Sequence, residues 1–291
     1  MSTLNSIILI TGCSSGIGLA LAQAFNERGC IVYATARHIE SINTLASRGL
    51  RILKLDITDS ENIEKAVEVI AQEHGRLDIL INNARYRQDG AVVDLPAKAL
   101  RRQFETNVIG PVQVARSFLP LLLAGQRGRI VNIGSISGIV ATPFSGAYCA
   151  SKAALNALSE SMRMELSPFG IDVIMIQPGK IASNIRKYSY THFILPPDSL
   201  YIPFQQHLQT RAQCSEHGAM SAKDFAAHVV EAVLADTAPI VIRKGPWSFK
   251  MPFLQRWLPK RQFDRFISEL FGLTKPALKK MAFAHEGPRV R

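Results

Sequence analysis

The sequence predicts an α/β fold built on a doubly wound parallel sheet, as a single domain with a helical extension at its carboxyl end. Up to about residue 180, short runs rich in β-branched residues alternate with longer amphipathic segments. Each parallel strand needs a crossover from the strand before it, and alternating strands and helices supply that crossover. The first short run also ends in a glycine-rich turn, as the first strand of an open α/β sheet often does.

Six buried strands and five helices are predicted from this alternation. The expected strands are residues 6–10, 31–34, 51–55, 79–81, 129–133 and 172–176. The expected helices are residues 18–28, 39–48, 60–74, 97–123 and 147–169. No internal repeat or low-complexity segment interrupts the pattern, so one sheet is the simplest arrangement.

The length and composition indicate one large domain with an appendage. A chain of 291 residues lies just above the usual size of one domain. We expect a domain over residues 1–242, with a substrate-lid segment at 184–217, and a basic amphipathic extension over 243–291. The mean hydropathy of +0.08 is typical of a soluble α/β protein. No apolar run approaches the roughly 18 residues of a membrane span, and no secretory signal is visible, so a cytoplasmic location is expected.

The cysteines give no sign of a metal or disulfide site. Cys13, Cys30, Cys149 and Cys214 lack metal-ligand spacing and form no Cys-x-x-Cys pair. A reducing compartment with free thiols is therefore expected, and no bound metal. Cys149 is expected to be a small packing residue, because no histidine lies close in sequence to activate it.

The glycine-rich turn predicts a phosphate-binding site at the start of the first helix. Its glycines permit a sharp turn and a close approach of the backbone to a pyrophosphate at a helix amino terminus. The spacing is Gly-x-x-x-Gly-x-Gly, and a tight strand-to-helix connection is the alternative. The candidate cofactor-binding residues here are Gly12, Ser14, Ser15, Gly16, Ile17 and Gly18.

The end of the second expected strand favours NADP(H) over NAD(H). An NAD site usually offers a carboxylate there to the ribose 2′-hydroxyl, but this chain has Arg37 and no acid. A guanidinium suits a 2′-phosphate. The alternative is that Arg37 simply begins the next helix, exposed to solvent.

Tyr148 and Lys152 predict acid–base chemistry on a carbonyl or an alcohol. Positions four apart share one face of a helix, so the phenol and the ammonium are expected to point into the same space. A free phenol ionises near pH 10, and a nearby ammonium favours the phenolate, which makes proton exchange with a substrate oxygen easier. Ser135, thirteen residues upstream of Tyr148, adds a hydroxyl that can hold a carbonyl. Taken alone, the pair is also compatible with an ordinary solvated helix face.

Together these motifs resemble those of the short-chain dehydrogenase/reductase family, over residue 6 to about residue 240. The resemblance implies a Rossmann-type fold and an adenine contact at Asp56 and Ile57. It matches Asn83 and Ala84 to the family's Asn-Asn-Ala-Gly turn and Asn107 to its structural and proton-relay asparagine. It also implies that Tyr148 and Lys152 of this chain contact the cofactor. The segment expected at the nicotinamide end contains Pro178, Gly179, Ile181 and Ser183.

The resemblance implies a catalytic set of Asn107, Ser135, Tyr148 and Lys152. In that scheme Ser135 holds the substrate carbonyl, Tyr148 supplies the proton and the nicotinamide supplies hydride. Lys152 tunes the phenol and binds the nicotinamide ribose. The leading interpretation is NADPH-dependent reduction of a ketone or aldehyde on a hydrophobic substrate, such as a steroid, retinoid, acyl-lipid or polyketide-like carbonyl. Alcohol oxidation and a non-catalytic cofactor-binding scaffold remain open.

The chain departs from the family at Arg85, where the Asn-Asn-Ala turn usually continues with glycine. If that position needs positive φ, a side chain there costs roughly 1 kcal/mol or more. Two interpretations are open: Arg85 points to solvent beside the cofactor, or it reaches an anionic substrate group or the cofactor phosphates. Ser183 replaces the usual threonine and keeps the hydroxyl.

The lid segment and the extension leave several partners open. The aromatic residues of the lid segment either contact a flat apolar substrate or pack the lid onto the body. From Arg243 onward, 12 Lys and Arg oppose 3 Asp and Glu, a net of +9 out of the total of +11, which leaves +2 for the body. The extension either contacts an anionic membrane or packs over the pocket or a second subunit. A homo-oligomer through residues 97–123 and 147–169 is expected by resemblance, and nucleic-acid binding is not expected.

Overall fold

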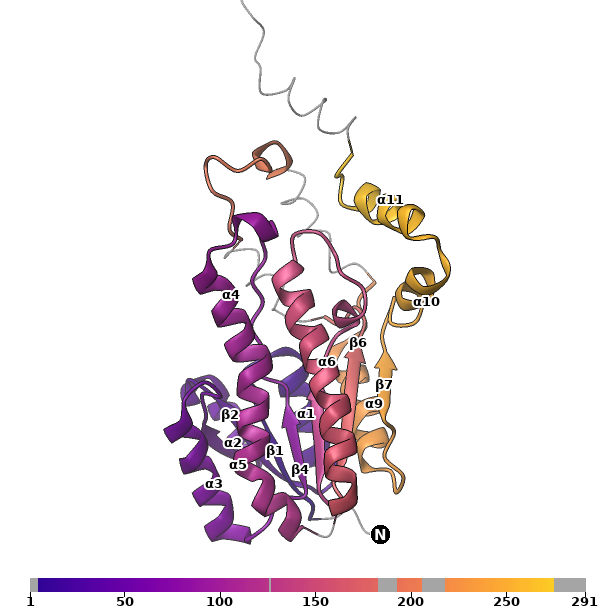
Figure 1. Ribbon diagram of the computed structural model, residues 1–291. Helices are drawn as coiled ribbons and strands as arrows, with labels where there is room; N and C mark the ends of the chain where they lie inside the picture. Colours follow the sequence, from indigo (N-terminus) through magenta and orange to yellow (C-terminus); the bar gives the residue numbers. More distant parts are fainter. Residues whose placement is uncertain (1–4, 126, 183–192, 206–217, 275–291) are drawn as a thin grey trace, which may run out of the picture.

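The computed structural model describes residues 5–125, 127–182, 193–205 and 218–274. Its centre is a seven-stranded sheet in the order β3-β2-β1-β4-β5-β6-β7, in which every neighbouring pair is parallel. The strands are β1 Ile7–Ile10, β2 Ile31–Ala36, β3 Arg51–Lys54, β4 Ile79–Asn82, β5 Arg129–Ile133, β6 Asp172–Pro178 and β7 Val241–Lys244. All six expected strands are confirmed, and the doubly wound prediction is correct (Figure 1).

The seventh strand is absent from the sequence prediction. β7 has four residues and follows the lid segment, beyond residue 180, where the regular alternation of strands and helices used for the prediction ends. It pairs with β6 at the edge of the sheet, with Ile176 opposite Ile242 and Pro178 opposite Lys244. It also crosses the expected division between residues 242 and 243, so the first two residues of the expected extension belong to the sheet.

Helices cover both faces of the sheet because alternate strand residues point to opposite sides. Ile8 and Ile10 of β1 pack with α1 Gly16–Glu27 and α9 Ala222–Leu234 on one face. Ile7 and Leu9 pack with α3 Ser60–His74 and α5 Gly110–Ala124 on the other. The expected helix over residues 39–48 is instead a 3₁₀ turn, Ile39–Ile42, followed by the short α2, Asn43–Ala46.

The long helix expected over residues 97–123 has a π-helical segment inside it. α4 Ala97–Phe104 leads into the π segment η3, Glu105–Ile109, which continues into α5. By length and composition the helical stretch Ala97–Ala124 meets the criteria for a membrane span, with a mean hydropathy of 1.3 in its most apolar window. Half of that window is buried, and the core residues of α5 pack on the sheet, so this is a core helix of the domain.

Two helices follow β7 and lie beyond the carboxyl edge of the sheet (Figure 1). α10 spans Lys250–Trp257, and α11 spans Lys260–Leu270, where the apolar periodicity predicts a helix. Phe263 and Ile267 of α11 and Met251 of α10 are buried against Val140, which lies in the loop after β5. The inner faces of these two helices therefore cover the loop that follows Ser135.

Candidate active site

The candidate catalytic residues gather where β4 and β5 end. α6, Gly146–Leu166, buries Tyr148 in its first turn and Lys152 in its second. The Lys152 Nζ donates a hydrogen bond of 2.7 Å to the carbonyl oxygen of Ile133, the last residue of β5, and lies 6.0 Å from the centre of the Tyr148 ring. The structure therefore places this pair at the carboxyl edge of the sheet and away from solvent.

Ser135 follows β5 and begins a short 3₁₀ turn, Ile136–Gly138. Its Oγ accepts a hydrogen bond of 3.0 Å from the backbone N–H of Ser137, so the hydroxyl caps this turn. The cap uses the oxygen as an acceptor, and its proton remains available to donate to another oxygen.

Burial controls the charge of Lys152. Desolvation lowers the pKa of the Lys152 ammonium from 10.5 to about 7, and repulsion from Arg85 adds to the shift. In the cofactor-free protein, Lys152 is therefore close to the midpoint of its titration at neutral pH.

Asn107 lies in the π segment, fully buried. Its Oδ1 accepts a hydrogen bond of 2.8 Å from the Tyr86 N–H, and its Nδ2 donates to the Tyr86 carbonyl at 2.9 Å and to the Ser151 Oγ at 3.1 Å. These bonds hold the backbone of Tyr86 against α6. The water-linked path from Asn107 to Lys152 stays a prediction.

Arg85 adopts no positive φ, so the strain expected at this turn is absent and the chain takes a different path from a glycine turn. The side chain is half-buried and makes no hydrogen bond or ion pair within the described residues. Desolvation lowers the pKa of Arg85, attraction to Tyr148 opposes that shift and repulsion from Arg87 adds to it. Its charge thus acts on both Tyr148 and Lys152.

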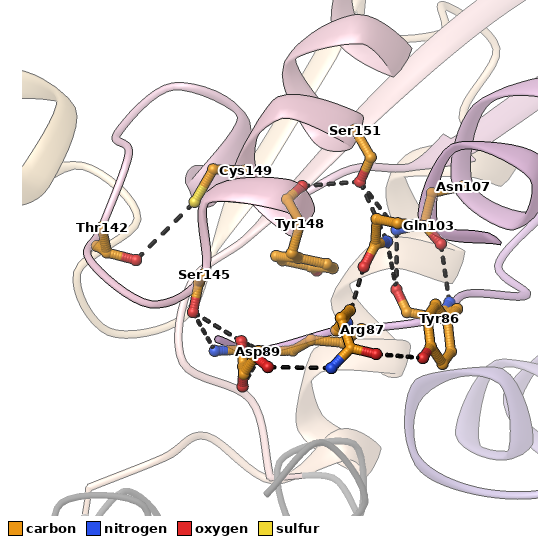
Figure 2. Close-up of polar contacts among 11 residues, drawn as sticks. Tyr86, Arg87, Asp89, Gln103, Asn107, Thr142, Ser145, Tyr148, Cys149 and Ser151 are labelled. Carbon is orange, nitrogen blue, oxygen red and sulfur yellow. Dashed lines mark hydrogen bonds and ion pairs between the residues drawn. The ribbon is translucent and has the colours of Figure 1, made fainter. Parts of the chain in front are cut away.

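Arg87 is a site residue to which the sequence analysis assigns no role. Its guanidinium carbon lies 5.2 Å from the centre of the Tyr148 ring (Figure 2). Its Nε contacts both carboxylate oxygens of Asp89 at 3.0 Å, and its Nη2 donates to the Ser145 Oγ at 2.9 Å. Burial lowers the pKa of Arg87, but the charges of Asp89 and Tyr148 outweigh burial and raise it. The Arg87 guanidinium therefore stays positively charged, and this charge lies beside the Tyr148 ring.

The Arg87 group ties its loop to the helix that carries Tyr148. Ser145 is the N-cap residue of α6, and its Oγ donates to the Asp89 Oδ1 at 2.8 Å. A carboxylate at this position is also favoured by the positive end of the helix dipole. The loop and the start of α6 are thereby fixed together.

Gln103 of α4 holds the same loop from the other side. It is fully buried, its Oε1 accepts from the Gln88 N–H at 2.8 Å and its Nε2 donates to the Tyr86 carbonyl at 2.8 Å. A longer bond of 3.3 Å joins Nε2 to the Ser151 Oγ (Figure 2). Sequence reasoning missed Gln103 because a single glutamine in a polar stretch gives no signal of burial.

The glycine turn has the shape of a phosphate cradle. Gly12 and Gly16 have φ of 73° and 59°, and a Cβ on Gly18 would come within 2.3 Å of the Gly12 carbonyl oxygen. Ser15 precedes α1 without a side-chain capping bond, and both Ser14 and Ser15 are exposed. The first amides of α1 are therefore open to a negatively charged group, which fits the diphosphate of a nicotinamide dinucleotide.

Comparison with known proteins decides the family. Residues 6–192 match the model of the family described as short chain dehydrogenase. The chain belongs to this family. It is 41% identical over 247 residues to the short-chain dehydrogenase ptmH of Penicillium ochrochloron, covering 83% of this chain and 89% of that protein. It is therefore an NAD(P)-dependent oxidoreductase that binds a small substrate and a nicotinamide cofactor.

Two further similarities are to a named reductase and to a solved structure. The dehydrogenase is 36% identical over 204 residues to an NADPH-dependent 1-acyldihydroxyacetone phosphate reductase of Schizosaccharomyces pombe, covering 68% of this chain and 69% of that one. A solved short chain dehydrogenase/reductase from Burkholderia phymatum, in complex with NAD, superposes with a TM-score of 0.76 at 21% identity, covering 88% and 94% of the two chains. The fold is thus that of a Rossmann-type dehydrogenase.

The remaining candidate cofactor residues of the dehydrogenase have distinct surroundings. Arg37 is exposed directly after β2 and forms no ion pair within the described ranges. Asp56 is half-buried and accepts hydrogen bonds from the N–H and hydroxyl of Thr58. Ile57 is buried against Gly110. Of these three residues, only Arg37 is exposed to solvent.

The Asn-Asn-Ala turn closes onto the glycine turn. The Asn83 Nδ2 donates to the carbonyls of Thr11 and Gly12, and Ala84 lies directly against Gly12.

The segment expected at the nicotinamide end is described only in part. Pro178 ends β6, and a Cβ on Gly179 would come within 2.2 Å of the Pro246 carbonyl oxygen. Ile181 is half-buried and bridges to Met220. Ser183 lies outside the described residues.

In the described part of the lid segment, residues 193–205, the aromatic residues pack on the body. Phe193 and Tyr201 contact the Phe144 ring, with centroids 6.2 and 5.3 Å away, and Phe204 is buried in the same cluster. Ile194 also forms a β-bridge with Gly90, in the loop that carries Arg87. This favours the packing interpretation for these aromatics. The lid tyrosines Tyr188 and Tyr190 lie outside the described residues.

The described cysteines are free and buried, and Cys214 lies outside the described residues. Burial raises the pKa of the Cys149 thiol, which keeps it protonated and unreactive, as the packing prediction requires. Burial raises the pKa of Cys13 to about 12. Among the residues that the structure describes, no cluster of His, Cys, Asp and Glu is arranged to hold a metal ion.

Proposed function

We propose that the dehydrogenase reduces a ketone or aldehyde on a hydrophobic substrate, with NADPH as reductant. The observation that carries this proposal is the buried Tyr148–Lys152 pair at the carboxyl edge of the sheet, the edge at which the glycine turn follows β1. Ligands of open α/β sheets bind at that edge. When bound there, NADPH would supply the hydride.

Four side chains hold the substrate carbonyl and move the proton. The Ser135 hydroxyl donates a hydrogen bond to the substrate carbonyl oxygen, and the Tyr148 phenol gives that oxygen its proton. Tyr148 is left as a phenolate, which the positive charge of Arg87 beside the ring stabilises. Lys152, whose ammonium has a pKa of about 7, is the proposed source of the proton that restores the phenol.

NADPH is proposed over NADH because of Arg37. Its exposed guanidinium stands after β2 with no carboxylate in its place, where a 2′-phosphate would meet it. The Schizosaccharomyces pombe relative is named for NADPH, which agrees with this choice.

The proposed substrate is a carbonyl on an apolar skeleton, such as an acyl lipid, steroid, retinoid or polyketide. The apolar cluster of Phe144, Phe193, Tyr201 and Phe204 lies beside the loop of Arg87. The same pombe relative is named for an acyl-chain ketone that carries a phosphate, and the half-buried Arg85 is a suitable partner for such a group. The enzyme is proposed to be cytoplasmic and homo-oligomeric.

The test is NADPH and NADH oxidation by the purified protein, followed at 340 nm with a panel of acyl, steroid and polyketide ketones. We expect turnover with NADPH and at least one apolar ketone, a preference for NADH after Arg37→Asp, and loss of turnover with intact NADPH binding after Tyr148→Phe. NADPH binding without turnover on any substrate, in either direction, would support a cofactor-binding scaffold instead. Alcohol oxidation with NADP⁺ as the faster direction would reverse the proposed reaction.

A further inference from the structure

The strongest surface feature outside the active site is a row of exposed aromatic residues along α10 and the turn before it. Phe249, Phe253 and Trp257 stand four residues apart, so they share one face of the helix. Their exposed fractions are 64%, 61% and 68%. We call these three residues the α10 aromatic row.

The opposite face of α10 is already packed inside the protein. Met251 is buried in the cluster with Val140 and Phe263, and Leu254 and Leu258 pack against it. α10 is therefore apolar on two faces, although a surface helix in water usually exposes a polar one. A contiguous exposed apolar patch of this kind marks an interaction site.

Trp247, in the turn before α10, extends the patch. It is 46% exposed, and its backbone has φ of 69°, a conformation that large side chains rarely adopt. A bulky residue persists in that conformation only where the surrounding structure requires it, and such outliers often occur at functional sites.

Two basic side chains lie beside the tryptophan rings of this patch. The Lys250 Nζ lies 5.2 Å from the Trp247 ring centre, and the Arg256 guanidinium lies 6.0 Å from that of Trp257. Between Gly245 and Phe263 the chain has four basic residues and no acidic one; the first acid, Asp264, forms an ion pair with Lys260 at 3.0 Å, and the other three carry their charge without an acid in this stretch. The patch thus presents aromatic side chains inside a rim of positive charge.

We propose that the α10 aromatic row and its basic rim dock the protein on the surface of an anionic lipid bilayer. Tryptophan and phenylalanine favour the boundary between headgroups and acyl chains, and lysine and arginine are attracted to anionic headgroups. A second copy of the chain is a poorer occupant, because a two-fold interface would place the patch against itself and bring like charges together.

The docking position has a consequence for substrate access. α10 and α11 pack on Val140, five residues after Ser135, so a bilayer against α10 lies on the same side of the molecule as the candidate active site. This consequence rests on the proposed function, whereas the docking itself does not.

Flotation of the full chain with vesicles tests the proposal. We expect the protein to float with vesicles of phosphatidylcholine and phosphatidylglycerol, to float far less with phosphatidylcholine alone, and to detach in 0.5 M KCl, where the Debye length falls to roughly 4 Å. Charge reversal at Lys250 and Arg256 removes at least two favourable contacts, so the partition coefficient should fall by about 30-fold or more. Phe253→Ser with Trp257→Ser should lower it by at least about ten-fold.

Phe169→Ser is the matched control. Phe169 is 66% exposed, like the row, but it ends the 3₁₀ turn after α6, at the opposite end of that helix from Tyr148. This variant should float like the wild type, and every variant should retain its melting temperature and NADPH binding. Equal flotation of the row variant and the wild type would overturn the proposal, as would equal binding to neutral vesicles. A change of sedimentation coefficient on mutating the row, without lipid, would show a protein interface instead.

Discussion

Lys152 is a buried amine whose titration is coupled to folding. Its pKa of about 7 in the folded protein lies below the 10.5 of the unfolded chain, so between these values the unfolded chain binds more protons. The free energy of unfolding of the cofactor-free protein should therefore rise with pH above 7, with a contribution of up to about 1.4 kcal/mol per pH unit.

Urea unfolding at pH 7, 8 and 9 measures this contribution. In Lys152→Met the rise with pH should be smaller than in the wild type by that amount. Lys98→Met replaces an exposed lysine of α4 and should leave the wild-type slope unchanged. Equal slopes in all three proteins would show that Lys152 keeps its ordinary pKa in the fold.

Arg87 is expected to support turnover through its charge on the Tyr148 ring. Arg87→Gln removes a cation 5.2 Å from the ring centre and leaves Asp89 without its ion pair, so kcat should fall by about 10- to 100-fold. Arg87→Lys should recover part of the loss, because lysine keeps the charge but not the planar fork.

Stopped-flow single turnover, together with the Kd of NADPH from fluorescence, separates chemistry from binding. The control is Arg102→Gln, whose exposed guanidinium lies 4.5 Å from the centre of the Tyr86 ring, on the outer side of the same loop. Equal losses in the two variants would mean that Arg87 acts only through the stability of the loop.

At the scale of the elements, a buried hydrogen-bond network joins α4, the π segment and α6 to the loop of residues 86–88. Gln103 on α4, Asn107 on the π segment and Ser151 on α6 share hydrogen bonds with each other and with the Tyr86–Gln88 backbone. These side chains are fully buried, so each bond is made without competition from water.

Gln103→Leu should weaken this hydrogen-bond network and lower the free energy of unfolding. The Tyr86 carbonyl keeps its bond from Asn107, but the buried Gln88 N–H loses its acceptor, which costs about 1–3 kcal/mol of unfolding free energy. Chemical denaturation measures the loss, and Gln113→Leu, an exposed position on α5, is the control. An unchanged stability would mean that water replaces the glutamine.

Local sequence patterns predict most of the elements but not the contacts between distant residues at the site. The strands, the glycine turn and the Tyr148–Lys152 pair are local patterns with a fixed period or spacing, and these were predicted. The Arg87–Asp89–Ser145 contacts join residues 56 or 58 positions apart, and their geometry depends on where the loop is held by Gln103. No local pattern carries that information. β7 is absent from the prediction for a different reason, because it lies beyond residue 180, after the lid segment, where the regular alternation of strands and helices ends.

At the scale of the whole molecule, the sheet and the carboxyl-terminal helices form one folding unit. β7 pairs with β6, and α10 and α11 bury Val140. A chain that ends at residue 242 loses half of β7 and exposes this cluster, so we expect it to aggregate or to melt at a markedly lower temperature. Calorimetry and light scattering check this, with a chain ending at residue 274 as the comparison. Equal melting temperatures would assign β7, α10 and α11 no part in stability.

The π segment also fixes the number of residues between α4 and α5. Each residue of an α-helix turns the chain by about 100°, and the extra residue of a π turn shifts the phase of everything before it relative to everything after it. α4 faces the site with Gln103 and α5 faces the core with Phe118 only in the present phase. A one-residue deletion within Glu105–Ile109 would therefore rotate α4 relative to α5. Gln103 would then no longer face the site while α5 packs on the sheet. The present fold therefore requires a fixed number of residues between Gln103 and α5.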